Sequence, residues 1–402
     1  MNIFQNLSSP VPADELEQRI TVFQKRLCKA GIDLALIRQN SDLYYFTGTV
    51  QDGHLFIPST GQPVMFVYRS YERARHESCL KNIAPLDSIK QLPSLLKERK
   101  LTFSSLGLEM DILPANLFHI YKKLFNIKGQ IHDISPIIRQ VRSVKSQLEI
   151  SFIKKACKQV AKVVEKVPEL FFAGMREIDL AASIEAEMRK LGHPGYLRIR
   201  GFNQELTMGQ VLSGPEAALP SWTNTPAGGV GVCSAYGVNA GFRRVKQGDP
   251  LSVDLGGSLN GYLCDQTRLF SIGKVRPQIS EFYKKICSIH DFIQALLKPD
   301  ANCGEIYDKG LKKAETLGLS DYFMGFGRDK VNFIGHGVGI EIDEYPFLSR
   351  GSKMILEKGM VVAVEPKLLI PDIGLIGIED TYLITTSGVE KLTLSPKEIR
   401  TL

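Results

Sequence analysis

The chain has 402 residues, of which 44% are hydrophobic and 23% charged, and its formal net charge is +7. This length suits two domains with cores of their own, and the composition is ordinary for a globular protein. No apolar run approaches the ~20 residues of a membrane span, and no basic motif is interleaved with aromatic residues. The sequence therefore argues against a membrane protein and against a nucleic-acid-binding protein.

Two features bear on the cellular compartment. The first residues, Met1–Gln5, lack the basic and apolar regions of a secretory signal. The seven cysteines include no CxxC pair and are typical of reduced thiols. We therefore expect a cytoplasmic protein.

The first part of the chain has the pattern of a mixed α/β domain. Helices are predicted over 15–30 and 40–48, and strands over 34–37, 64–68 and 106–110. A boundary is indicated between Ser135 and Ser146, so we expect two domains, 1–140 and 141–402.

The second part begins with two predicted helices, over 147–172 and 178–191. The stretch 194–241 is rich in Gly, Pro, Ser, Thr and Asn, and it predicts strands with long loops beside a site. Two hairpins, 248–270 and 359–384, flank a further helical region at about 278–318. The order predicts an α+β fold in which an α-β-β unit occurs twice, with pseudo-twofold symmetry.

The two hairpins carry acids at matching positions. Gly248 stands six residues before Asp254, and Gly359 stands six residues before Glu365; the return strands carry Asp265 and Glu379. Apolar and polar residues alternate around these acids, and Asn260-Gly261 is a hairpin turn signal. A single acid beside glycines is usually a turn residue, but four acids at paired positions in apolar strands predict a shared site. Four buried carboxylates need compensation, and a metal ion would provide it.

A histidine between the hairpins is the fifth candidate. His336 lies in Gly335-His336-Gly337-Val338-Gly339, where the glycines allow the backbone to approach a site closely. A lone histidine is more often a core or surface residue than a ligand. Carboxylates with one imidazole favour Mn²⁺, Co²⁺ or Fe²⁺, with Zn²⁺ as a further candidate.

At these residues the chain resembles the metallopeptidase family of methionine aminopeptidase, aminopeptidase P and prolidase. The resemblance implies a pita-bread catalytic domain with two divalent metal ions and Glu365 as the general base. The implied metal ligands are Asp254, Asp265, His336, Glu365 and Glu379. The segments 32–36 and 43–48 are similar to a creatinase-type N-terminal domain, which favours the prolidase and aminopeptidase P branch.

The chain departs from the family pattern at four places near these residues. Ser221 and Asp343 stand where the family peptidases usually have histidines, and Asn332 stands where prolidases often have one. Lys367 follows Glu365-Pro366 where glycine is usual. The accessory histidines donate hydrogen bonds or protons, whereas an ionised aspartate cannot donate. We therefore include Ser221 and Asp343 with Glu365 as candidate catalytic residues.

The expected function is metal-dependent hydrolysis of an amide bond, by an Xaa-Pro dipeptidase or Xaa-Pro aminopeptidase. One alternative is hydrolysis of a small non-peptide amide or amidine, and another is a non-catalytic binding protein on the same fold. The expected partners are a peptide or small amide substrate and a second copy in a homodimer, with no nucleic acid and no membrane.

Overall fold

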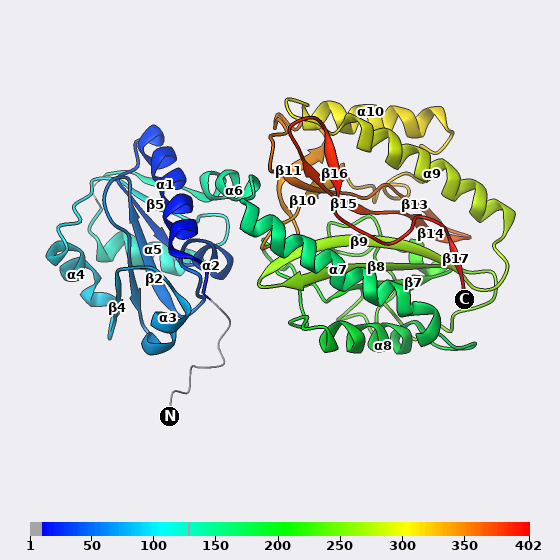
Figure 1. Ribbon diagram of the computed structural model, residues 1–402, viewed down its shortest axis with the longest axis horizontal. Helices are drawn as coiled ribbons and strands as arrows, with labels where there is room; N and C mark the ends of the chain where they lie inside the picture. Colours follow the sequence, from blue (N-terminus) through cyan, green and yellow to red (C-terminus); the bar gives the residue numbers. More distant parts are fainter. Residues whose placement is uncertain (1–9, 128) are drawn as a thin grey trace. The chain divides into compact units, whose positions relative to one another are not determined.

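The computed structural model describes residues 10–127 and 129–402, which divide after Val141 into two compact units (Figure 1). The expected boundary was residue 140. The segment Met1–Gln5, on which part of the cytoplasmic expectation rests, lies outside the described residues. Among the described residues, no helix has the length and apolar character needed to cross a membrane.

The N-terminal unit is built on a six-stranded sheet of order β4-β3-β2-β1-β5-β6. Strands β1, β2 and β3 pair antiparallel, and the outer pairings β3–β4, β1–β5 and β5–β6 are parallel. Its elements are α1 (Ala13–Ala30), β1 (Leu34–Ile37), α2 (Asn40–Thr47), β2 (Gly53–Pro58), β3 (Val64–Val67), α3 (Tyr71–Glu77), β4 (Ile83–Pro85), α4 (Leu92–Glu98), β5 (Leu106–Leu108), α5 (Ala115–Leu124) and β6 (Ile131–Asp133).

The predicted elements of this unit are confirmed, with small shifts at their ends. Helix α1 ends at Gly31, which has a φ of 68° and whose N–H closes the last turn on Cys28 and Leu27. Helix α2 is capped by the side chain of Gln39, one residue before the predicted cap, and ends at Gly48. Helix α6 (Ser135–Ser143) spans the division between the units.

The C-terminal unit contains sheets of five, four and two strands. Their orders are β11-β10-β12-β15-β16, β17-β9-β8-β7 and β13-β14. The elements are α7 (Gln147–Leu170), α8 (Glu177–Lys190), β7 (Gly209–Ser213), β8 (Pro250–Leu259), β9 (Tyr262–Ser271), α9 (Pro277–Leu296), α10 (Cys303–Thr316), β10 (Phe333–Gly337), β11 (Glu344–Ser349), β12 (Val361–Val364), β13 (Lys367–Ile370), β14 (Gly374–Gly377), β15 (Asp380–Ile384), β16 (Val389–Lys391) and β17 (Arg400–Thr401).

The sheets of this unit lie between two pairs of helices, α7 with α8 on one side and α9 with α10 on the other (Figure 1). Helix α7 begins at a capping box, in which Ser146 and Glu149 satisfy each other's backbone N–H groups. Each helix pair precedes one of the acid-bearing hairpins in the chain. The α+β fold with its repeated helix and hairpin unit is therefore confirmed.

The first predicted hairpin is regular. Strands β8 and β9 pair antiparallel over ten residue pairs, from Pro250↔Ser271 to Leu259↔Tyr262. The turn residues Asn260 and Gly261 both have positive φ, 49° and 79°, as a two-residue hairpin turn requires.

The second hairpin is divided into two ladders. Strand β12 pairs with β15, and the outer part of the hairpin forms the separate pair β13–β14. The ladder is interrupted at Glu365-Pro366 and again at Ile378-Glu379. Proline has no N–H to donate to a ladder, so Pro366 ends β12 next to the acid.

Candidate active site

Five elements bring the predicted ligands together at one place in the C-terminal unit. Asp254 and Asp265 lie on β8 and β9, His336 lies on β10, Glu365 follows β12, and Glu379 precedes β15. The side chains of His336, Glu365 and Glu379 are nearly inaccessible to solvent. The hairpins therefore position four carboxylates and one imidazole in a small, mostly buried volume.

His336 faces three of these acids through a single ring nitrogen. Its Nε2 lies 3.4 Å from Glu365 Oε1, 3.8 Å from Glu379 Oε1 and 4.0 Å from Asp265 Oδ2. Its Nδ1 lies 3.1 Å from the carbonyl oxygen of Gly337, to which only a protonated nitrogen can donate. With Nδ1 donating to this carbonyl, a neutral imidazole would offer its Nε2 lone pair on the side of the acids, as a metal ligand requires.

The two hairpins are joined at the site by a reciprocal pair of threonines. Thr267, two residues after Asp265, donates its hydroxyl to Glu379 Oε2 at 2.9 Å. Thr381, two residues after Glu379, donates its hydroxyl to the carbonyl oxygen of Asp265 at 2.8 Å and accepts from the Asp265 N–H at 3.0 Å. These contacts fix the two return strands relative to each other.

Lys367 is a sixth member of the cluster. Its Nζ donates to Glu365 Oε2 at 2.7 Å, to Asp254 Oδ2 at 2.9 Å and to Glu379 Oε2 at 3.2 Å. The sequence showed that Lys367 departs from the family pattern but did not predict this position. A usable signal was present, since Glu365 and Lys367 are two residues apart in an extended segment and therefore point to the same face.

The charges of the cluster shift its pKa values in opposite directions. Burial opposes ionisation of Glu365, but Lys367 and His336 lower its pKa to about 2. Burial, assisted by the charges of Glu365 and Asp254, raises the pKa of Glu379 to about 8 although Lys367 opposes this. Burial likewise raises the pKa of Asp265 well above its usual value. Asp265 and Glu379 thus lack enough positive charge nearby to compensate the burial of their ionised carboxylates.

The donors of the cluster fit one divalent metal ion. Asp265, His336 and Glu379 each offer a ligand atom, and these atoms lie within 4.8 Å of one another. Glu379 Oε1 is buried and has no hydrogen-bond partner among the described residues, a condition that native proteins rarely tolerate. A divalent ion at this position would satisfy that oxygen and compensate the two carboxylates.

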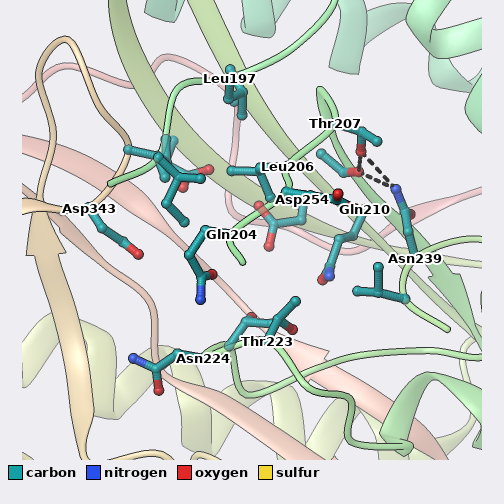
Figure 2. Close-up of a pocket in the computed structure, with 18 of the residues that line it drawn as sticks. Leu197, Gln204, Leu206, Thr207, Gln210, Thr223, Asn224, Asn239, Asp254 and Asp343 are labelled. Atoms are coloured by element: carbon teal, nitrogen blue, oxygen red, sulfur yellow. Dashed lines mark hydrogen bonds between the residues drawn. The ribbon is translucent and has the colours of Figure 1, made fainter. Parts of the chain in front are cut away.

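The cluster opens into a cavity of about 460 Å³ within the C-terminal unit. Asp254 and Asp343 line it, and in Figure 2 they lie on two sides of it with the amide of Gln204 between them in this view. Further polar lining comes from Gln210 and Asn224. The stretch 194–241 thus supplies much of the wall, as its composition predicted.

The two residues at the usual histidine positions differ in their placement. Asp343 lines the cavity, and its Oδ1 lies 3.4 Å from His336 Nδ1. Ser221 is not among the lining residues, and its hydroxyl donates to the carbonyl oxygen of Gly237 at 2.6 Å. Ser221 is therefore a poor candidate for contact with a substrate, because its one proton is already committed to the backbone.

A two-unit chain with a buried carboxylate and imidazole cluster beneath a cavity has the architecture of a metallopeptidase. The chain belongs to metallopeptidase family M24, whose sequence profile matches residues 151–386. The profile of the creatinase/prolidase N-terminal domain matches residues 19–144. The expected family, the pita-bread fold and the assignment as a peptidase enzyme are confirmed.

Individual relatives match over nearly the whole chain. An Xaa-Pro dipeptidase of Pyrococcus horikoshii is 29% identical over 390 residues, covering 96% of this chain and 99% of the relative. The crystal structure of the prolidase from Pyrococcus horikoshii OT3 superposes with a TM-score of 0.80 at 28% identity, over 95% of this chain and 99% of the other. An Xaa-Pro dipeptidase from Bacillus anthracis gives a TM-score of 0.82 at 26% identity, over 96% and 100%.

Proposed function

We propose that the chain is a metal-dependent hydrolase of Xaa-Pro peptide bonds, acting as a dipeptidase or an aminopeptidase on short peptides. The observation that carries the proposal is the convergence of Asp265, His336 and Glu379 around a buried, unsatisfied carboxylate oxygen beside a cavity. The relatives named Xaa-Pro dipeptidase support the choice of bond.

In this proposal, Asp265, His336 Nε2 and Glu379 Oε1 hold a divalent ion, with Glu365 Oε1 as a further ligand. Such an ion supplies Lewis acidity toward the scissile carbonyl and lowers the pKa of a water molecule. The oxygen-rich donor set favours Mn²⁺, Co²⁺ or Fe²⁺, and Zn²⁺ is a further candidate.

Glu365 is proposed as the proton acceptor. It lies beside His336 on one side and accepts from Lys367 on the other. Its contacts with Lys367 and His336 favour the ionised carboxylate, and a general base must be in its ionised form to take a proton from the attacking water.

The charge of the cavity wall bears on which end of the substrate it receives. Asp343, Glu185 and Glu205 line the cavity in addition to the central acids, and His336 and Lys367 are the basic side chains among the described lining residues. We propose that this acidic wall receives the amino terminus of the peptide, with Asp343 as the contacting carboxylate.

The same acidic wall favours one alternative, hydrolysis of a small cationic amide or amidine. A non-catalytic binding protein is not proposed, because all five predicted ligands are retained and converge. The homodimer and the cytoplasmic location stay predictions.

A substrate panel tests the proposal. Protein loaded with Mn²⁺, Co²⁺, Fe²⁺ or Zn²⁺ is given Xaa-Pro dipeptides, Xaa-Pro-Yaa tripeptides, matched Xaa-Ala peptides and small amidines, and product amines are quantified. We expect release of the first residue from the Xaa-Pro substrates. Turnover confined to the amidines, or no turnover with any of these metals, would contradict the proposal.

A further inference from the structure

We propose that the ammonium group of Lys367 takes the place of one of the two metal ions expected for this family, so that the site binds one divalent ion per chain. The inference rests on the proposed function in one respect: the remaining ion is held by Asp265, His336 and Glu379. It replaces the two-ion centre that the family resemblance implies.

Lys367 makes the contacts of a bound cation. An ammonium group has three N–H donors, and those of Lys367 are used by three carboxylates, Asp254, Glu365 and Glu379, at 2.9, 2.7 and 3.2 Å. The side chain is 3% exposed. Lysine is almost never this buried unless it is paired, and here its pairing is complete.

Two of the acids divide their oxygens between two cation positions. Glu365 turns Oε2 toward Lys367 and Oε1 toward His336 Nε2. Glu379 likewise turns Oε2 toward Lys367 and leaves Oε1 near His336 Nε2. Carboxylates that bridge two cations have this arrangement. Here the ammonium nitrogen of Lys367 already fills one of the two cation positions.

The backbone around Lys367 is shaped to hold the side chain in place. Lys367 pairs with Gly377 across β13 and β14, and a Cβ at Gly377 would lie 2.5 Å from Lys367 Cγ. The Lys367 carbonyl accepts from the Met324 N–H at 2.9 Å, and its N–H lies 3.3 Å from Met324 Sδ. The lysine stem therefore fits a groove that requires glycine on the facing strand.

A second metal ion and this ammonium group cannot occupy the same position. Metal–carboxylate bonds are about 2.0–2.2 Å long, so an ion bound by Asp254, Glu365 and Glu379 would fill the space that Nζ occupies.

Metal stoichiometry tests this inference without depending on catalysis. The wild-type chain and Lys367→Gly are saturated with Mn²⁺, dialysed, and analysed by elemental analysis and by electron paramagnetic resonance. We expect one Mn²⁺ with an uncoupled spectrum in the wild type. We expect two ions in Lys367→Gly, coupled because two-metal sites hold their ions about 3.5–4 Å apart. Lys358→Gly, at an exposed turn lysine, is the matched control and should keep one ion.

Two coupled ions in the wild type, no ion in the wild type, or a single ion in Lys367→Gly would each overturn the inference. The wild-type measurement stands by itself if Lys367→Gly fails to fold. Wild-type protein that binds one ion but hydrolyses no peptide would leave this inference intact and contradict the proposed function instead.

Discussion

Replacing Arg142 with methionine should strongly destabilise the catalytic unit. Arg142 Nη2 lies 2.5 Å from Glu344 Oε1 and 2.9 Å from Glu341 Oε2, and the three side chains are between 2% and 5% exposed. Glu344 in turn accepts from the N–H groups of Ile340 and Glu341, next to the cavity residue Asp343. Removing the guanidinium leaves two buried carboxylates with weakened compensation.

The stability lost in Arg142→Met can be estimated from the structure in two ways. Breaking a buried ion pair by removing one partner costs about 3–5 kcal/mol. Independently, burial opposes ionisation of Glu344, but Arg142 and Lys145 lower its pKa from 4.5 to about 2, and that difference corresponds to about 3 kcal/mol. Lys145, whose Nζ lies 3.2 Å from Glu344 Oε2, stays in place in the variant. We therefore expect the free energy of unfolding to fall by about 3 kcal/mol, at the lower end of that range.

The pH dependence provides a second readout. Since the folded-state pKa of Glu344 lies below the unfolded value, its contribution is present above pH 4.5 and is lost as the pH falls toward 2. In Arg142→Met the pKa of Glu344 should rise, so this part of the acid sensitivity should shrink.

Thermal unfolding followed by circular dichroism at pH 7 and at acidic pH measures both effects. A loss of about 3 kcal/mol corresponds to a fall of about 6–12 °C in Tm for a unit of this size. Adding Glu344→Gln to Arg142→Met removes one uncompensated charge and should recover part of the loss. A change below about 1 kcal/mol, with unchanged acid sensitivity, would refute this reasoning.

Three further predictions concern the site. Glu365→Gln should keep the fold and lower kcat by about 10²–10⁴, because the amide cannot accept a proton; unchanged turnover on Xaa-Pro peptides would reassign the base. Asp343→His should raise kcat on peptides by about 10²–10³ because it adds a cavity-facing donor, and it should also raise KM because the carboxylate that contacts the amino terminus is lost. Ser221→His should change neither, and the reverse ranking would contradict the cavity assignment. Gly377→Ala should lower the free energy of unfolding by about 1–3 kcal/mol, because the new Cβ would clash with Lys367. Gly237→Ala is the control, since its Cβ would meet nothing nearer than 3.9 Å. Equal Tm values for the two variants would count against the proposed groove.

The hairpins could be predicted from the sequence because their signals are local. Alternation of apolar and polar residues sets the faces of β8 and β9, and Asn260-Gly261 sets the register between them. The positions of Asp254 and Asp265 follow from that register. The division of the second hairpin does not follow from its likeness to the first; Pro366, which cannot donate to a ladder, is the local signal for it.

The spacing of Lys367 from Glu365 indicates the face on which its side chain lies but not the contacts it makes, and the placement of Ser221 has no local signal at all. Whether a strand lysine extends to solvent or into a cluster depends on the facing strand, here on the space left by Gly377. Ser221 lies in a glycine-rich and proline-rich stretch without periodicity, so nothing local determines the direction of its hydroxyl.

Titration of the metal-free protein tests both the metal dependence of hydrolysis and the number of ions that the site uses. The chain is stripped with a chelator, Mn²⁺ is added in steps, and kcat/KM for an Xaa-Pro dipeptide is measured at each step. We expect activity to disappear on stripping and to return in proportion to added metal, reaching its plateau at one Mn²⁺ per chain. Activity that survives stripping, or a plateau reached only at two ions per chain, would contradict this expectation.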